Sequence, residues 1–286
     1  MINKENILLN KIPELMKNVK EKSPLTQCIT NFVTVNDCAN AVLAIGGSPI
    51  MSNESQEAEE LGNIINSLLI NIGTLTKNQI KAMEKASAHA NKLNKPFVLD
   101  PVGAGVSQIR NQTTVNIIKN STPSIIRGNL SEIKTIATLI GILEECSTTK
   151  GVDVAEDDKI TEENLKDLGL LVKNIAKKLE TTIAVSGPID IISNGEKTYY
   201  IRNGDKMMSQ ITGTGCMLGC IMASYTAITN PLEAAITATV TFGIAGEISA
   251  EKSKNKGTGT FRTNLIDELS TMTPEKIEKY GKISEK

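Results

Sequence analysis

The sequence predicts an α/β protein with a mainly parallel central sheet that is covered by helices on both faces. Short β-branched runs alternate with helical stretches along the chain of 286 residues, and this alternation is typical of parallel strands joined by helices. No repeat and no low-complexity linker interrupts it, so we expect one domain spanning residues 1–286.

The order of the elements follows from this alternation and from local stop signals. Gly46 and Gly47 end one predicted helix, and Thr76 is a good N-cap for another. Residues 189–193 and 197–201 flank Asn-Gly-Glu, a tight-turn signal that predicts a hairpin. We expect further strands at 25–30, 48–52, 67–73, 96–100, 123–129 and 181–187. We expect helices at 6–20, 35–46, 55–66, 76–94, 130–141, 162–179, 214–228, 231–250 and 262–280.

The composition argues against several classes of function. The formal net charge is −1 and aromatic residues make up 3%, so we expect neither nucleic-acid binding nor attachment to anionic membranes. No segment approaches the roughly 20 apolar residues that a membrane-spanning helix needs. The five cysteines are odd in number and lack the spacing of a zinc site, which favours a reduced, cytoplasmic protein.

Open α/β sheets bind ligands beyond the carboxyl ends of their strands, and several polar residues fall there. Asp100 follows the apolar run PFVL, where a hard cation such as Mg2+ would satisfy its carboxylate. Arg127 leaves a later strand, and Glu132 lies in the first turn of the next helix. Together they could hold Mg2+ and phosphate, with Asn129 orienting a metal-bound water. Structural roles for the two acids, in a turn and at a helix end, are the alternatives.

The stretch QITGTGCMLGCIMA, residues 210–223, joins a glycine-rich run to an apolar helix. Gly213 and Gly215 permit several N–H groups to converge, and the helix adds its positive end, so we expect an anion-binding pocket. Cys216 falls in the first helical turn, where a thiol pKa is normally lowered and a thiolate could accept a proton from an alcohol. Cys216 as a small buried hydrophobe is the alternative, and Cys220 is expected in the core.

Three further residues bear on function. Met51, at a strand exit, has a flexible thioether that suits the flat face of a ring, although a core position is favoured. Asn31 offers a polar group at another strand exit. His89, the single histidine, falls in a polar helical pattern and is expected at the surface, which excludes Ser-His-Asp and Cys-His catalysis.

Six segments together resemble the hydroxyethylthiazole kinases, a thiamine-salvage family of the ribokinase-like fold. They are PLTQCITNFVTVNDCANAVLAIGGSPIMS, VLDPVGAG, IIRGNLSEI, AVSGPIDII, GTGCMLG and GTGTFRTNLID, and the resemblance runs from about residue 7 to 280. The cysteine of GTGCMLG is the most discriminating feature, because sugar kinases of this fold usually have an aspartate at that position.

The resemblance implies that ATP phosphorylates the alcohol of 4-methyl-5-(2-hydroxyethyl)thiazole, with Mg2+, in a homotrimer whose sites lie at subunit interfaces. Ser186 stands where the family more often has threonine and retains the hydroxyl, whereas residues 151–158 depart from the family pattern and receive no role. With the residue-level analysis, the resemblance assigns Met51, Gly213 and Asn31 to the substrate, Arg127, Ser186 and Gly215 to ATP, Asp100 and Glu132 to the metal, and Cys216 to general base catalysis.

Three alternatives remain open. An ATP-dependent dehydratase of hydrated nicotinamide nucleotides would keep the anion-binding loop but would normally have a carboxylate at position 216. A kinase of the pyrimidine half of thiamine is disfavoured for the same reason. A catalytically idle binding protein would have no need of Asp100, Arg127, Glu132 and Cys216 together.

Overall fold

The protein, described by a computed structural model over residues 7–144 and 159–285, contains one nine-stranded sheet in that part of the chain. Residues 151–158, which received no role above, lie outside these ranges. The strands are β1 (Leu25–Ile29), β2 (Ser48–Ile50), β3 (Ser67–Asn71), β4 (Phe97–Asp100), β5 (Ile125–Asn129), β6 (Thr182–Ser186), β7 (Asp190–Ser193), β8 (Thr198–Ile201) and β9 (Ile283–Glu285). Their spatial order is β2-β1-β3-β4-β5-β6-β7-β8-β9.

The sheet is mainly parallel, as predicted. Strands β1 to β6 all pair in parallel, and β7, β8 and β9 extend the sheet with antiparallel pairings. The predicted hairpin is confirmed as the antiparallel pair β7 and β8. The carboxyl ends of the six parallel strands therefore share one edge of the sheet, which is where ligands bind in open α/β sheets.

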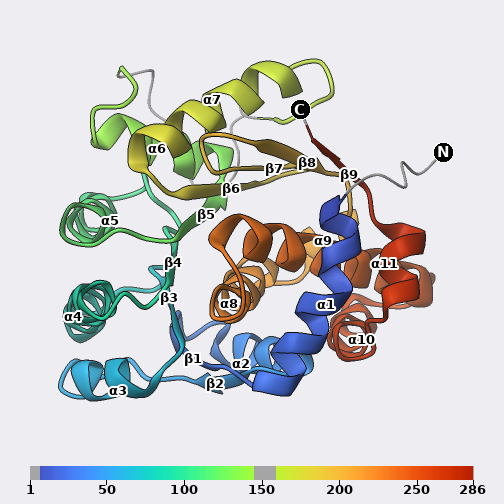
Figure 1. The fold of residues 1–286 in the computed structure, drawn as a ribbon, viewed down its shortest axis with the longest axis horizontal. Coiled ribbons are helices and arrows are strands. Elements are labelled where there is room, and N and C mark those ends of the chain that lie inside the picture. The colour runs from blue at the N-terminus through green and yellow to red at the C-terminus, as the bar shows by residue number, and fades with distance from the viewer. Residues whose placement is uncertain (1–6, 145–158, 286) are drawn as a thin grey trace.

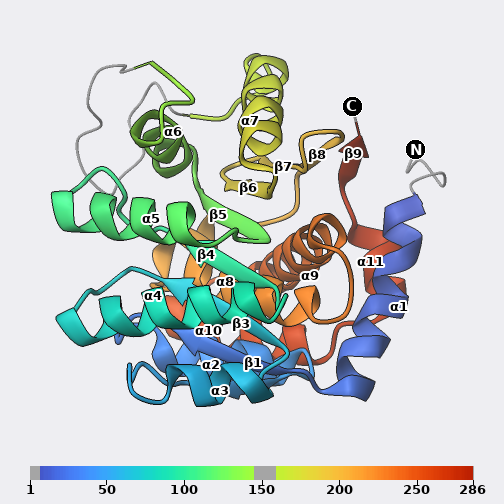
Figure 2. The ribbon, with the colours of Figure 1, turned by 60° about the vertical axis from the view of Figure 1, so that its left-hand side comes forward.

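Helices cover both faces of the sheet (Figures 1 and 2). One face carries α3 (Ala58–Ile64), α4 (Lys77–Lys92), α5 (Gln108–Asn120), α6 (Leu130–Leu139) and α7 (Leu165–Leu179). The other carries α1 (Ile7–Lys22), α2 (Val35–Ala44), α8 (Thr214–Thr226), α9 (Pro231–Lys252), α10 (Thr258–Ser270) and α11 (Pro274–Tyr280). The short 3-10 helix η2 (Lys206–Gln210) precedes α8. Within the described ranges, no helix is both long enough and apolar enough to span a bilayer.

Two hydrophobic cores lie on opposite faces of the strands. In β3, Leu69 joins the core beneath α8, whereas Leu68 and Ile70 join the core beneath α4. Successive side chains of a strand point to opposite faces, so both faces of a covered strand must be apolar. This is why the sequence of β3 is a continuous apolar run and not an alternating pattern.

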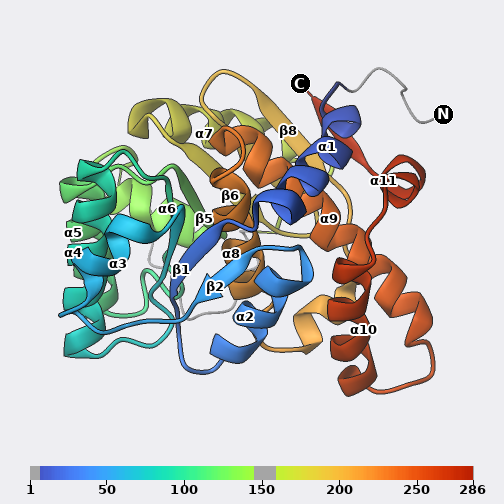
Figure 3. The same ribbon diagram turned by 60° about the horizontal axis from the view of Figure 1, so that its bottom comes forward.

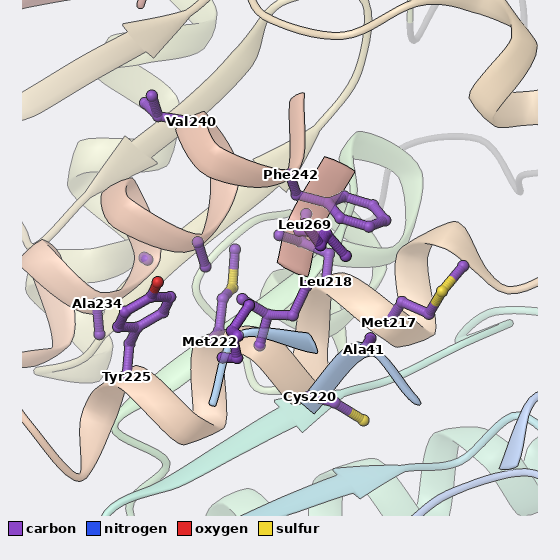
Figure 4. Packing of buried hydrophobic residues seen from close by; sticks show 14 of the residues in the cluster. Ala41, Met217, Leu218, Cys220, Met222, Tyr225, Ala234, Val240, Phe242 and Leu269 are labelled. Atoms are coloured by element: carbon purple, nitrogen blue, oxygen red, sulfur yellow. The ribbon is translucent and has the colours of Figure 1, made fainter. Parts of the chain in front are cut away.

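Helix α8 occupies the centre of one of these cores. Every residue from Cys216 to Thr226 is buried, which is expected of a helix that is apolar all round. Figure 4 shows Met222 and Tyr225 of this helix among neighbouring apolar side chains, and Figure 3 shows α2 and α10 on the same side of the sheet. Cys220 is fully buried, so its predicted core position is confirmed.

The elements differ from the sequence prediction at a few places. Helix α5 was not predicted, because it buries only Thr113, Thr114 and Ile117 and its apolar period is weak. The helix predicted at 262–280 is wrong as a single element: α10 ends at Ser270, and Thr273 caps a new helix that begins with Pro274. The Thr76 cap of α4 is confirmed, and His89 on the same helix is half-buried against Asn63.

Candidate active site

A pocket of about 330 Å³ opens at the carboxyl edge of the parallel strands. Its wall comes from the segments that follow β1, β3 and β4, from the end of β5 and the start of α6, and from the N-terminus of α8. Seven of the predicted site residues line it: Asn31, Arg127, Asn129, Glu132, Gly213, Gly215 and Cys216, whereas Met51, Asp100 and Ser186 do not. Segments far apart in the sequence therefore meet at the edge that the strand order predicts.

The glycines at the start of α8 are required by close packing. Gly213 is the N-cap and has a φ of +88°, and a Cβ there would lie 2.5 Å from Thr34 Cγ2. A Cβ on Gly215 would lie 2.6 Å from Arg127 Nη1. The first helical hydrogen bond runs from Met217 N–H to Gly213 O, so the N–H groups of residues 214–216 precede the bonded part of the helix. This geometry suits an anion at the helix N-terminus.

Asp100 and Arg127 form a buried pair, in which Arg127 lines the pocket and Asp100 lies behind it, outside the lining residues. Arg127 Nη1 lies 3.4 Å from Asp100 Oδ2, and the Asp100 side chain is fully buried. Burial raises the pKa of the Asp100 carboxyl to about 7, against the opposing effect of the Arg127 charge. Arg127 Nη2 donates to Ser186 Oγ at 3.0 Å, while its buried Nε has no partner within the described residues.

Glu132 combines a pocket position with a capping role. Its Oε2 accepts from the N–H of Asn129 at 2.8 Å, and Asn129 Oδ1 accepts from the N–H of Glu132 at 2.8 Å, which completes a capping box. Its Oε1 accepts from the N–H of Gly103 at 2.8 Å and so fixes the loop after β4. The carboxylate is therefore anchored by two backbone donors on the wall of the pocket.

Cys216 is buried, with 8% of its surface exposed, and its sulfur receives two amide donors. Asn31 Nδ2 lies 3.2 Å from Sγ, and Asn71 Nδ2 lies 3.3 Å from it. Burial raises the pKa of the Cys216 thiol to about 11, and the negative charge of Asp100 adds to the effect. The expectation of a lowered thiol pKa is therefore wrong, because loss of solvent outweighs the helix N-terminus.

Met51 does not line this pocket. It follows β2, the edge strand of the sheet, and packs half-buried against the core beneath α8. The structure therefore does not bring Met51 together with the other predicted substrate residues, Asn31 and Gly213.

Sequence reasoning missed three residues around the pocket. Asn71 ends β3 and contacts both Asp100 and Cys216. Thr34 donates to Asn31 Oδ1 at 3.1 Å and packs against Gly213. Arg110 on α5 donates to the carbonyl oxygens of Ile72, Gly73 and Val102, each at 2.7 Å. The one usable signal was a polar Asn at the end of an otherwise apolar strand.

Known proteins resemble the chain along nearly its whole length. The hydroxyethylthiazole kinase family matches residues 16–275. Hydroxyethylthiazole kinase 1 of Methanosphaera stadtmanae is 60% identical over 278 residues, which cover 96% of this chain and 98% of that protein. The solved structure of the hydroxyethylthiazole kinase protein of Pyrococcus horikoshii has a TM-score of 0.85 at 35% identity and covers 97% of this chain and 99% of that chain.

A distant structure supports the fold alone. A ribokinase-like superfamily protein of Enterococcus faecalis has a TM-score of 0.57 at 13% identity and covers 89% of each chain. Taken with the family match and the extensive identity above, the chain belongs to the hydroxyethylthiazole kinase family and has the ribokinase-like fold.

Proposed function

We propose that this protein transfers the γ-phosphoryl group of ATP to the hydroxyl of 4-methyl-5-(2-hydroxyethyl)thiazole. The observation that supports this most strongly is the 60% identity to a hydroxyethylthiazole kinase, together with a pocket where Arg127, the N-terminus of α8 and Cys216 face one space. Phosphoryl transfer depends mainly on positioning and charge stabilisation, and these groups can supply both.

Arg127, Ser186 and the glycine run are proposed to hold ATP. The guanidinium presents a planar fork to phosphate oxygens, and Ser186 contributes by accepting a hydrogen bond from Arg127 Nη2 and so holding this fork. The unpartnered Nε of Arg127 adds a buried donor that a phosphate oxygen would satisfy. Gly213 and Gly215 leave the first amides of α8 open to the transferring group and to the substrate.

Asp100 and Glu132 fit the binding of Mg2+. Both supply carboxylate oxygens, which Mg2+ prefers, and Mg2+ commonly uses one or two carboxylates together with waters and nucleotide phosphates. The buried Asp100 carboxyl would also be stabilised in its charged form by a cation. When bound, Mg2+ supplies positive charge to the phosphate oxygens.

Cys216 is proposed as the general base for the substrate hydroxyl. With a pKa of about 11 the sulfur is a thiol at neutral pH, so the reactive form is the minor thiolate. The amides of Asn31 and Asn71 both donate to this sulfur and so favour its negative form. In a loose transition state the substrate hydroxyl loses its proton late, so a base that is present mostly as the thiol is sufficient.

We further propose a homotrimer whose active sites lie between subunits. Met51 is assigned to the thiazole yet is not among the residues that line the pocket of its own chain, which supports its supply by a neighbouring subunit. Val33, which lines the pocket, and the adjacent Phe32 expose 54% and 73% of their surfaces, as apolar residues at an interface would. Asn31 and Gly213 would contact the substrate from the subunit that supplies Cys216.

The test is ATP consumption with three candidate substrates, followed by identification of each product. We expect ADP and a phosphorylated thiazole alcohol only with the thiazole. Turnover of hydrated nicotinamide nucleotide or of the pyrimidine alcohol in preference to the thiazole would contradict the proposal, as would a purified protein without ATP turnover.

A further inference from the structure

Asn71 connects two groups of the candidate active site, and the function proposed above uses only its hydrogen bond to the Cys216 sulfur. It is fully buried at the carboxyl end of β3. Its Nδ2 lies 2.8 Å from Asp100 Oδ2 and 3.3 Å from Cys216 Sγ. Its Oδ1 accepts from Asn31 Nδ2 at 3.0 Å and from the N–H of Gly73 at 2.9 Å. The side chain thus uses both hydrogens and both lone pairs.

The orientation of this amide is determined by the backbone. The N–H of Gly73 can only donate, so the group that faces it must be the oxygen of Asn71. The NH2 group of Asn71 must then face Asp100 and Cys216. Because Asn71 Oδ1 is an acceptor, the group of Asn31 that contacts it must in turn be its NH2. One backbone amide therefore fixes the direction of the whole network.

The network holds the Cys216 sulfur in place at the wall of the pocket. Two N–H donors, from Asn31 and Asn71, reach Sγ, while Cys216 also lines the pocket. The same Asn71 amide holds one oxygen of Asp100, whose carboxylate is also held by Arg127. Asn71 is the one residue that contacts both side chains by hydrogen bonds among those that the structure describes.

We propose that Asn71 is a positioning residue that holds the Asp100 carboxylate and the Cys216 sulfur at fixed positions relative to each other for the transfer step. The proposal rests on the function proposed above, since both side chains act in that reaction. A role in stability alone would lower the free energy of unfolding and leave turnover of the folded enzyme intact. If Asn71 has a positioning role, its loss lowers kcat and leaves substrate affinity unchanged, because misplaced groups stabilise the transition state less but still allow the substrate to bind.

The decisive variant is Asn71→Asp, which preserves shape and keeps an oxygen for Gly73 and Asn31. Its second oxygen replaces the NH2 group and cannot donate, so the hydrogen bonds to Asp100 and Cys216 are lost. We expect kcat with ATP and the thiazole alcohol to fall about 100-fold, with both KM values changed by less than about threefold. Asn120→Asp is the matched control, because it makes the same change on an exposed residue at the far end of α5 and should leave kcat unchanged.

A second variant, Asn71→Ser, covers the case in which the aspartate prevents folding. Its hydroxyl can replace at most part of the network, so we expect a folded protein with a lowered melting temperature and a smaller loss of kcat. Wild-type kcat in a folded Asn71→Asp or Asn71→Ser protein would overturn the proposal, and so would loss of folding in both. If the wild-type protein itself lacks kinase activity, the function proposed above fails instead, which is a separate result.

Discussion

The guanidinium of Arg127 lies against the backbone of Gly215, so closely that a Cβ on this glycine would come within 2.6 Å of Nη1 and 2.7 Å of Nη2. Asp100 and Ser186 hold the same guanidinium from other sides. The missing side chain at position 215 therefore lets a fixed cation and the N-terminus of α8 face one part of the pocket.

Gly215→Ala should separate activity from stability. The new methyl group fits a helix but displaces the guanidinium, so kcat/KM for ATP should fall roughly 10- to 100-fold, as expected for hydrogen bonds to a charged group. The free energy of unfolding should fall by only about 1–3 kcal/mol, because the displaced guanidinium loses its contacts with Asp100 and Ser186, while the helix preference of alanine offsets up to about 1 kcal/mol of this loss. Steady-state kinetics and urea denaturation measure the two effects.

Gly259→Ala is the control for this variant. Gly259 lies in the first turn of α10, and a Cβ there would meet nothing within 4 Å. This control should keep full activity. If Gly215→Ala also keeps full activity, the function of Arg127 does not depend on its close contact with Gly215.

Cys216→Ser should lower turnover by about 100-fold, the lower end of what a positioned base contributes. A serine hydroxyl gives up its proton less readily than a thiol, and the smaller oxygen sits farther from the two amide donors. Nucleotide binding, measured by calorimetry with ADP, should change little. Wild-type turnover should also rise with pH toward the thiol pKa of about 11, and the serine variant should lack this rise. Equal turnover in both proteins would remove Cys216 as the base.

The sequence was sufficient to find the residues at the strand exits. Asp100, Arg127 and Glu132 each stand where an apolar run gives way to a loop or a helix, and the glycine run before Cys216 marks a helix N-terminus. These signals are local, because they depend on what a strand or helix end does to its nearest residues. The parallel sheet then brings them to one edge, as the fold class predicts.

Features that depend on packing could not be found this way. The thiol pKa of Cys216 depends on burial by groups that lie far away in the chain, whereas the helix terminus beside it was visible in the sequence. Asn71 becomes meaningful only when β3 and β4 place it next to Asp100 and Cys216. Arg110 belongs to a helix that the apolar pattern did not reveal.

Asp100→Asn should change how stability depends on pH. Burial raises the pKa of Asp100 from 3.8 to about 7. Between these values the unfolded chain has lost the proton that the folded chain keeps, so folding becomes less favourable as pH rises, by up to about 1.4 kcal/mol per pH unit. This contribution is fully present below 3.8 and lost by about 7. The asparagine side chain of the variant does not titrate in this range, so its stability lacks this pH dependence.

Urea denaturation in EDTA at a series of pH values would measure this effect. The wild-type free energy of unfolding should fall relative to that of Asp100→Asn across the acidic range and run parallel to it above neutrality. Parallel curves throughout would mean that Asp100 has the same pKa in the folded and the unfolded chain, which would contradict the shift. The variant should be inactive as a kinase in either case, because a carboxylate proposed for Mg2+ is lost.

Shared active sites predict complementation between two defective subunits. Met51→Ala should weaken binding of the thiazole alcohol, and Cys216→Ala should slow transfer, so each homotrimer should be slow at low alcohol concentration. In a cyclic trimer that mixes both variants, one site in each ring combines Cys216 of one subunit with Met51 of its neighbour. Random assembly of equal amounts should therefore restore about a quarter of the wild-type sites.

Co-expression with two affinity tags isolates the mixed assemblies, and sedimentation establishes how many subunits they contain. Recovery of activity in the doubly tagged fraction, above the sum of the two parents, is the expected result. A mixed trimer without recovery would mean that Met51 acts within its own chain or has no contact with the alcohol. Recovery would show that a neighbour's Met51 serves the pocket, because Met51 follows the edge strand β2 and is not among the residues that line the pocket of its own subunit.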